Sequence, residues 1–496
     1  MATGDVQITI ADGGSAVAVV PQAQVQLVIG CSSIGTVAAP VATSNPNTLA
    51  STFGFGPLPE AAALACQAGA TVIAMRCTSN TAGAQSAVQS AGKTGTSAIT
   101  TTGNANDDYY IKFLCVAGGT IGTTGITFQI SLDAGRNYGP VLALGTANTY
   151  LIPNTGVTLA FAAGTLIAAD YVLVQCTAPL WNTAGIQACL NAFQASQYGV
   201  QGVGSIHIVG PMSGANASTL EGYLDTLATG NIFDRAIVNT RDANAPNAWT
   251  GTTTESDTTW VNSVALDYST VSARRVCANA GHYNMPSAFS NPAAGSPRFR
   301  RPLAWALAAR EVTIPPQRHA GRVRDGNLSQ IVIDAINDPQ DGFVYHDERI
   351  LAGLDAARFS SARTRIRQPG FFIVNPKLMS PLGSQFTFLP HGNVIDIASD
   401  IAYDRGQVEV NDDVRQNPNG TIYESDAKDL ETVINNALAA QMVNARMVSS
   451  AKFVVDRTWN VGATNKVQGV LSVLPRPYVL EVDITIAFQL PQQAGG

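Results

Sequence analysis

The stretch VQLVIGCSSIGT at residues 25–36, continued by FGFGPLPEAAALACQAGA at 53–70 and TVIAMR at 71–76, decides the fold of this chain. Residues 25–29 and 71–76 are short apolar runs of the length of buried strands, and residues 59–68 between them predict a short helix. A buried strand, a helix and a second buried strand are typical of a β-α-β opening.

The same alternation returns after residue 178. Helices are expected at 183–195, 218–227 and 258–271, and strands at 205–209, 234–239 and 274–278. Helices that alternate with buried strands predict a mostly parallel sheet covered by helices. Between the two halves lie Thr- and Gly-rich alternating runs at 110–116, 126–131 and 172–177, which predict an inserted β-rich domain.

After Pro369 the sequence predicts a last unit of mixed α and β structure. Its strands are expected at 371–374, 394–398, 452–457, 466–473 and 478–490. Residues 427–448 predict the longest amphipathic helix of the chain.

Both ends of the chain carry an isolated alternating run. Val6, Ile8 and Ile10 alternate with polar residues near the N-terminus. The apolar residues of the C-terminal run are Leu480, Val482, Ile484, Ile486, Phe488 and Leu490. An isolated strand can neither satisfy its backbone groups nor bury its apolar face, so each run must join a sheet. That sheet can belong to another subunit, or to this chain if its two ends pair with each other.

Composition favours self-association. Charged residues are 13% of the 496 and apolar residues are 46%, with a net charge of −6. An average soluble domain has about 25% charged residues, so much of this surface is neutral and little charge repulsion opposes contact between copies. No run reaches the roughly 18 apolar residues of a membrane helix. Residues 1–14 also lack the features of a signal peptide, so we expect a protein made in a cytosol, with no membrane partner.

Seven cysteines are spread singly, without the CxxC spacing of zinc or redox sites. They are Cys31, Cys66, Cys77, Cys115, Cys176, Cys189 and Cys277. We therefore expect no metal site. The thiols are interpreted mainly as small buried apolar groups, with disulfides formed after release from a reducing cell as the alternative.

Motifs for catalysis or cofactor binding are incomplete. AVQSAGKT at 87–94 has Ala87 where a phosphate-binding loop needs its first glycine, and GVQGVG at 199–204 precedes a strand instead of opening a helix. The five histidines lack metal-ligand spacing, and no GxSxG elbow offers a nucleophile. We expect no catalytic residue, no cofactor and no metal. A triad dispersed along the chain, as in an α/β hydrolase, stays open as an alternative.

Arginine is concentrated in two stretches. The first holds Arg298, Arg300, Arg301, Arg310, Arg318, Arg322 and Arg324, and the second holds Arg358, Arg363, Arg365 and Arg367. Nucleic-acid binding is one interpretation, but the chain is acidic overall and these stretches lack interleaved exposed aromatics. We favour ion pairs to neighbouring subunits or to an acidic partner surface, with a solvated basic face as the alternative.

Several segments, taken in order, resemble contractile phage tail sheath proteins. In the first part of the chain they are residues 25–36, PVATSNP at 40–46, FGFGP at 53–57 and AGATVIAMR at 68–76. In the last part they are VIDIA at 394–398, VNDD at 410–413, GTIYESDAKDLE at 420–431 and PRPY at 475–478. The order of these segments, and no single one of them, carries the resemblance.

The resemblance implies a structural protein of a virion tail, assembled in the host cytoplasm as stacked hexameric rings in a helical lattice around a tail tube. Its partners would be further copies of itself, the tail tube protein, and baseplate and tail terminator proteins, without nucleic acid. Neighbouring copies would exchange strands from their terminal arms, whose apolar residues are Val6, Ile8, Ile10, Val482, Ile484, Ile486 and Phe488. Contraction, a rigid-body transition between two packings, would drive the tube through the host envelope for genome ejection.

The expected fold class is α/β (α+β) with several domains: a helix-covered mixed sheet core, an inserted β-rich domain, and a C-terminal α+β assembly domain with extended, strand-forming terminal arms. The predicted boundaries are 1–22 for the N-terminal arm, 23–91 and 179–369 for the core, 92–178 for the surface-facing insertion, 370–478 for the assembly domain and 479–496 for the C-terminal arm. The sheath of a tailocin or of a contractile secretion apparatus is an alternative.

Overall fold

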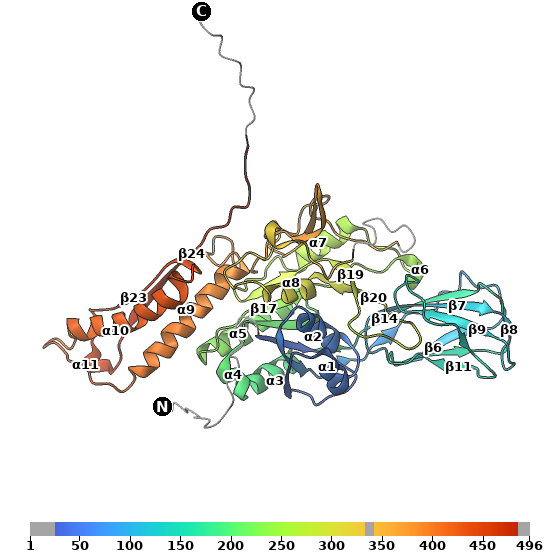
Figure 1. Ribbon diagram of the computed structural model, residues 1–496, viewed down its shortest axis with the longest axis horizontal. Helices are drawn as coiled ribbons and strands as arrows, with labels where there is room; N and C mark the ends of the chain where they lie inside the picture. The colour runs from blue at the N-terminus through green and yellow to red at the C-terminus, as the bar shows by residue number, and fades with distance from the viewer. Residues whose placement is uncertain (1–24, 333–341, 485–496) are drawn as a thin grey trace, which may run out of the picture. The chain divides into compact units, whose positions relative to one another are not determined.

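The computed structural model describes residues 25–332 and 342–484 (Figure 1). The chain divides into two compact units, residues 1–393 and 394–496. The predicted N-terminal arm lies outside the described residues, as do Ile486 and Phe488 of the predicted C-terminal arm.

A six-stranded sheet forms the centre of the first unit. Its order is β18-β17-β16-β1-β3-β2, and every neighbouring pair is parallel except β2 with β3. The strands are β1 (Val25–Gly30), β2 (Pro40–Thr43), β3 (Thr71–Arg76), β16 (Ser205–Pro211), β17 (Ala236–Asn239) and β18 (Val276–Asn279). The predicted β-α-β opening is confirmed, since β1 and β3 pair in parallel from Val25 opposite Thr71 to Gly30 opposite Arg76.

Helices cover both faces of this sheet because its strands are apolar on both sides (Figure 1). Leu27 and Ile206 face a core shared with α3 (Thr183–Gln194), α5 (Gly214–Thr229) and α7 (Asp257–Asp267). Val28 and Ile237 face a second core, shared with α2 (Pro57–Gln67) and α8 (Leu303–Glu311). Shorter helices are α1 (Pro46–Phe53), α4 (Gln197–Gln201) and α6 (Asn247–Thr250). The helices and strands predicted between residues 183 and 278 are thereby confirmed.

The inserted region between β3 and α3 is a β-sandwich. A five-stranded sheet, β10-β9-β7-β14-β5, and a three-stranded sheet, β11-β12-β6, contribute side chains to one core, where the rings of Phe113 and Phe161 lie 5.4 Å apart. The short strands β10 and β11 are Leu142–Ala143 and Thr149–Leu151. Its principal strands are β6 (Ile99–Gly103), β7 (Tyr109–Ala117), β9 (Thr127–Ser131), β12 (Val157–Phe161) and β14 (Tyr171–Thr177). The three predicted strands are confirmed. β5 (Ala84–Gln85) pairs with β14, so this sheet includes residues ahead of the predicted start at 92.

Two antiparallel hairpins complete the first unit. They are β19 (His282–Pro286) with β20 (Arg298–Pro302), and β21 (Ala362–Arg365) with β22 (Gln368–Ile373). β22 contains most of the strand predicted at 371–374. It lies in the first unit, whereas the predicted assembly domain begins at residue 370.

The second unit packs helices against a small sheet. α9 (Leu389–Val408) leads into it, and α10 (Glu424–Leu438) continues into a π-helical turn (Ala439–Val443). β23 (Val448–Val455) pairs in antiparallel fashion with β24 (Gly469–Pro475), and α11 (Val461–Thr464) lies between them in sequence. The strands predicted at 452–457 and 466–473 overlap β23 and β24.

Two predictions for this part of the chain are wrong. Residues 394–398, expected as a strand, lie inside α9, where Val394, Ala398 and Ile401 face one core. That spacing of four and three residues is one face of a helix, and five residues of alternation were too few to distinguish the two periods. The helix expected at 427–448 ends earlier, because β23 already begins at Val448; α9, with 20 residues, is the longest helix of the described residues.

Candidate assembly surface

Among the described residues, the sheet of the second unit has two strands. One face, including Phe453 and Val473, packs on the core of α9 and α10. The opposite face exposes Val454, Val470 and Leu474, of which the first two lie directly opposite each other. A two-stranded sheet is marginally stable in water, so this one depends on the helices that cover one face.

The outer edge of β23 is occupied by side chains of α10. The amide of Asn435 donates to the Phe453 carbonyl at 2.9 Å and accepts from the Phe453 N–H at 2.7 Å. Glu431 accepts from the Val455 N–H at 2.7 Å. These backbone groups are the ones that an added strand would use, so α10 blocks this edge.

The outer edge of β24 is open in the described structure. Backbone groups in an antiparallel pair alternate between facing the partner strand and facing outward, and directly opposed residues share the same direction. The backbone N–H and carbonyl of Phe453 point away from β24, so those of its partner Leu471 point away from β23. The backbone groups of Val473, two residues further along β24, point the same way as those of Leu471. Among the described strands β24 has no second neighbour.

The segment that follows β24 exposes apolar side chains. Residues 476–484 form neither helix nor strand, and Val479, Leu480, Val482 and Ile484 are 83%, 61%, 72% and 77% exposed. The strand predicted at 478–490 is therefore wrong over its described part. Its alternation is that of a strand, but it pairs with no described strand, and an alternating run forms a strand only where another strand pairs with it.

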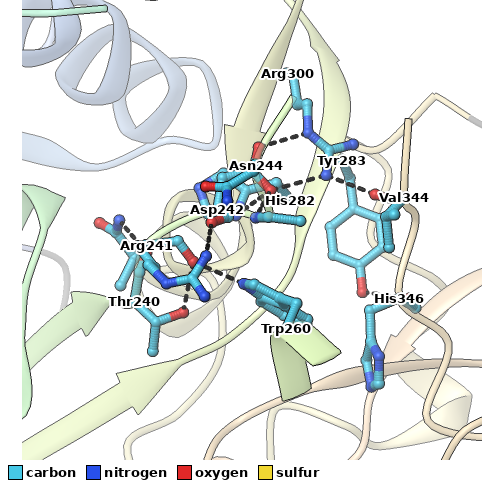
Figure 2. Close-up of polar contacts among 12 residues, drawn as sticks. Thr240, Arg241, Asp242, Asn244, Trp260, His282, Tyr283, Arg300, Val344 and His346 are labelled. Carbon is cyan, nitrogen blue, oxygen red and sulfur yellow. Dashed lines mark hydrogen bonds and ion pairs between the residues drawn. The ribbon is translucent and has the colours of Figure 1, made fainter. Parts of the chain in front are cut away.

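A network of buried charges lies beyond the carboxyl end of β17 (Figure 2). Arg300 donates to Asp242 through Nε at 2.6 Å and through Nη2 at 2.8 Å, and it also donates to the Val344 carbonyl. His282 Nδ1 lies 3.4 Å from Asp242 Oδ1. Burial raises the pKa of Asp242, but the charge and the hydrogen bonds of Arg300 outweigh it and hold that pKa below its usual range.

Neither histidine of this region has the partners of a catalytic triad. Burial lowers the pKa of His282 to about 4. His346 has a carboxylate on each nitrogen, Asp257 at 3.1 Å and Glu348 at 2.9 Å. No hydroxyl or thiol is hydrogen-bonded to either ring within residues 25–332 and 342–484, and the space that both rings line has no room for a water molecule. The contacts of His346 are those of ion pairs that stabilise the fold, and His282 is a neutral buried ring.

A buried tryptophan lies at the point where sheets of this kind commonly bind ligands. Numbered along the chain, the five parallel strands lie side by side in the order 2-1-3-4-5, and the direction of this order reverses between β1 and β16. Doubly wound sheets bind ligands at such a reversal, outside the carboxyl ends of the strands. Trp181, returning from the insertion, lies there and donates from Nε1 to the Val209 carbonyl at 2.7 Å. The thiols of Cys31, Cys77 and Cys189 belong to the same core cluster.

All seven cysteines are buried free thiols, at most 8% exposed. No two of these cysteines are joined by a disulfide within this chain. Burial raises the pKa of the Cys66 thiol to about 11 and that of Cys277 to about 12, which disfavours the reactive thiolate. No cluster of three or more His, Cys, Asp or Glu side chains that could hold a metal occurs in the described part of the chain.

The arginines separate into buried and exposed groups. Arg301 bonds Asp107 at 2.5 Å, with side chains 3% and 1% exposed, and Arg300 bonds Asp242 with side chains 6% and 25% exposed. For these two, the expected ion pairs to neighbouring subunits are wrong, because their carboxylate partners lie in the same chain. Arg318, Arg322, Arg324 and Arg367 remain on the surface.

The described structure is that of an α/β protein with an inserted β-sandwich and a separate C-terminal α+β unit. The chain belongs to the DUF2586 family, since the sequence model of the DUF2586 N-terminal domain matches residues 3–376. No curated protein matches its sequence. No helix in the described ranges is long and apolar enough to cross a membrane.

Solved structures of tail sheath proteins are similar to this chain. The sheath tail protein of Desulfitobacterium hafniense is 11% identical with a TM-score of 0.44, over 95% of this chain and 100% of that one. The sheath tail protein of Listeria innocua is 9% identical with a TM-score of 0.43, over 91% and 95%. The contracted helical sheath of the anti-feeding prophage is 12% identical with a TM-score of 0.37, over 64% and 78%. The predicted resemblance to tail sheath proteins is thus confirmed.

Proposed function

We propose that this chain is the structural subunit of a contractile tail sheath. It polymerises with further copies of itself as stacked hexameric rings around a tail tube, and contraction drives the tube through the host envelope. The sheath meets baseplate and tail terminator proteins at its ends. Two observations carry the proposal: β24 has no second neighbour among the described strands, and the segment 479–484 that follows it exposes alternating apolar side chains.

Strand addition between copies would satisfy both features at once. A strand from a neighbouring copy would bond the outward backbone groups of Leu471 and Val473, and it would extend the sheet face that exposes Val470 and Leu474. α10 covers the other edge, so addition is directed to β24. Val6, Ile8 and Ile10 of the N-terminal arm would supply a second strand.

Electron microscopy of the purified protein tests the proposal. We expect tubes from the natural chain, and none from Val482→Asp combined with Ile484→Asp, because a carboxylate cannot be buried unpaired against a neighbouring sheet. Circular dichroism should show that this double variant, and the control variant described next, are as folded as the natural chain. The matched control, Glu481→Ser with Asp483→Ser, changes the opposite side of the same segment and should still form tubes. Tubes from the double aspartate variant would contradict the proposal that the C-terminal segment adds a strand to a neighbouring copy.

Deletions test the two arms separately. Removal of residues 1–12 or of 480–496 should leave a folded monomer that cannot polymerise. Ordinary tubes from either deletion would contradict the role of that arm. Purification of the native particle distinguishes a phage from a tailocin or a contractile secretion apparatus, because only the phage carries a filled head. Small discrete oligomers that hydrolyse a chromogenic ester would favour the α/β hydrolase instead.

A further inference from the structure

The two arginine-rich stretches of the sequence meet on the surface of the first unit. Segment 319–328 runs along β22, where the Leu328 N–H donates to the Phe371 carbonyl at 2.9 Å and the Asn327 amide donates to the Pro369 carbonyl at 3.2 Å. The hairpin of β21 and β22 carries the other arginines. The basic patch is defined here by its six arginines, Arg318, Arg322, Arg324, Arg363, Arg365 and Arg367.

The charge of the basic patch is mostly uncompensated. Asp325 pairs with Arg318 at 3.6 Å and with Arg322 at 3.2 Å. Among the described residues the other four arginines form no ion pair, and the neighbouring carboxylate of Asp347 is buried and bonded to Thr364. Ile366 at the tip of the hairpin is 78% exposed. The patch therefore fits a partner that is both acidic and partly apolar.

The second unit carries a surface segment of that kind. The acidic segment, VEVNDDV at residues 408–414, follows α9 and has three carboxylates, Glu409, Asp412 and Asp413. None of these carboxylates forms an ion pair with any described residue, while Val408, Val410 and Val414 are exposed between them. Acidic and apolar side chains thus alternate along a short exposed stretch.

We propose that the basic patch of one copy binds the acidic segment of a neighbouring copy. This inference rests on the proposed function, because it supplies a second contact between sheath subunits beside strand addition. The two surfaces differ, so the contact is heterologous. Heterologous contacts produce rings where the rotation closes and open helical assemblies where it does not. Exposed ion pairs add modest affinity but fix orientation and register, and they weaken as salt rises.

Engineered cysteines test the contact between chains. The natural cysteines are buried, so R367C on one chain and D412C on another provide the reactive thiols. Mixing the two variants under mild oxidation should give a disulfide-linked dimer, roughly tenfold more than the control mixture of R274C with D412C, because contact raises the effective concentration of the thiols. Each chain carries only one of the two engineered cysteines, so a contact within a single chain cannot give a disulfide in this mixture. Equal yields from both mixtures would overturn the inference.

Charge reversal tests the same contact in the polymer. Arg324→Glu with Arg367→Glu should reduce the mass of sedimented tubes at low salt by ~10-fold, which corresponds to about 1.4 kcal/mol. Asp412→Arg with Asp413→Arg should do the same, and all four changes in one chain should restore tubes. The control Arg274→Glu reverses an exposed arginine elsewhere in the first unit and should change nothing.

The outcomes separate the inference from the function on which it rests. Tubes from both reversed variants in natural amounts would overturn the contact and leave the sheath proposal intact. A disulfide-linked dimer from a chain that never forms tubes would support the contact and overturn the sheath. Tight binding of the natural chain to DNA that Arg324→Glu with Arg367→Glu abolishes would assign the patch to nucleic acid and overturn the inference.

Discussion

At the residue scale, buried ions constrain this fold most strongly. The guanidinium of Arg301 lies 4.7 Å from the ring centroids of both Phe299 and Trp305 and bonds the buried carboxylate of Asp107. Removing one charge leaves the other buried without a partner, which costs far more than losing an exposed pair. The two residues are separated by 194 positions, so their pair also joins the insertion to the core.

Replacement of this arginine is the first prediction. Arg301→Met should lower the free energy of unfolding of the first unit by about 3–5 kcal/mol, because Asp107 is left buried and uncompensated. Urea unfolding followed by tryptophan fluorescence measures the change. The control Arg274→Ala removes an exposed pair with Asp225 and should cost at most about 1 kcal/mol. Equal costs for the two variants would contradict the argument.

His346 predicts a pH dependence of stability. Burial lowers its pKa, but the bonds to Asp257 and Glu348 outweigh this and raise that pKa from 6.5 to about 9. A raised pKa stabilises the fold fully below the unfolded value of 6.5, and the contribution is lost as the pH rises through 9. We expect roughly 3 kcal/mol of stability to be lost across this range, at about 1.4 kcal/mol for each pKa unit.

Substitution identifies His346 as the source of this effect. His346→Gln should remove most of the fall in unfolding free energy between pH 6.5 and 9, measured by urea unfolding at each pH. His282→Gln serves as the control, because a group with a pKa of about 4 is neutral throughout this range and cannot contribute to the slope. A slope that disappears in the control variant would contradict the assignment.

At the scale of elements, α10 decides which edge of the small sheet is open. Its polar side chains take the place of a third strand along β23, and β24 is left without an equivalent cover in the described chain. An uncovered strand edge pairs readily with another chain. Helix α10 therefore determines where an added strand can bind.

Removal of this cover is a further prediction. Asn435→Ala leaves the Phe453 N–H and carbonyl without their partner and should destabilise the second unit by about 1–3 kcal/mol. Hydrogen exchange at the Phe453 amide should become faster. Asn436→Ala, one residue on and exposed, is the matched control and should leave that exchange rate unchanged. Unchanged exchange in both variants would show that Asn435 does not protect the edge.

At the scale of the whole molecule, the insertion is bonded to the core of the first unit by several side chains in addition to the chain connections. Besides the pair of Arg301 with Asp107, Arg136 donates to the Tyr345 hydroxyl at 2.9 Å, and the Arg298 N–H donates to Asp133 at 3.0 Å. These contacts come from segments far apart in the sequence. They tie the sandwich to the hairpin of β19 and β20 and to its surroundings.

The insertion should therefore unfold together with the core. Hydrogen exchange in increasing urea should release the amides of Phe113 in the insertion and Ile206 in the core at the same denaturant concentration, because contacting parts of one cooperative unit open together. Arg301→Met should separate the two transitions, so that the Phe113 amide exchanges at a lower urea concentration than the Ile206 amide. Separate transitions in the natural chain would contradict this coupling.

The sequence by itself determined the alternation of apolar strands and helices from Val25 to Asn279 and the strands of the insertion. Those features depend on periodicity and composition within short windows, which the chain carries locally. Only the tertiary structure decided that residues 394–398 continue a helix, that Arg301 meets Asp107, and that the two arginine stretches share one surface. It also decided that β24 and not β23 keeps an open edge, since that depends on which side chain of α10 reaches which backbone group. Contacts of this kind join residues far apart in the sequence, and no local pattern specifies them.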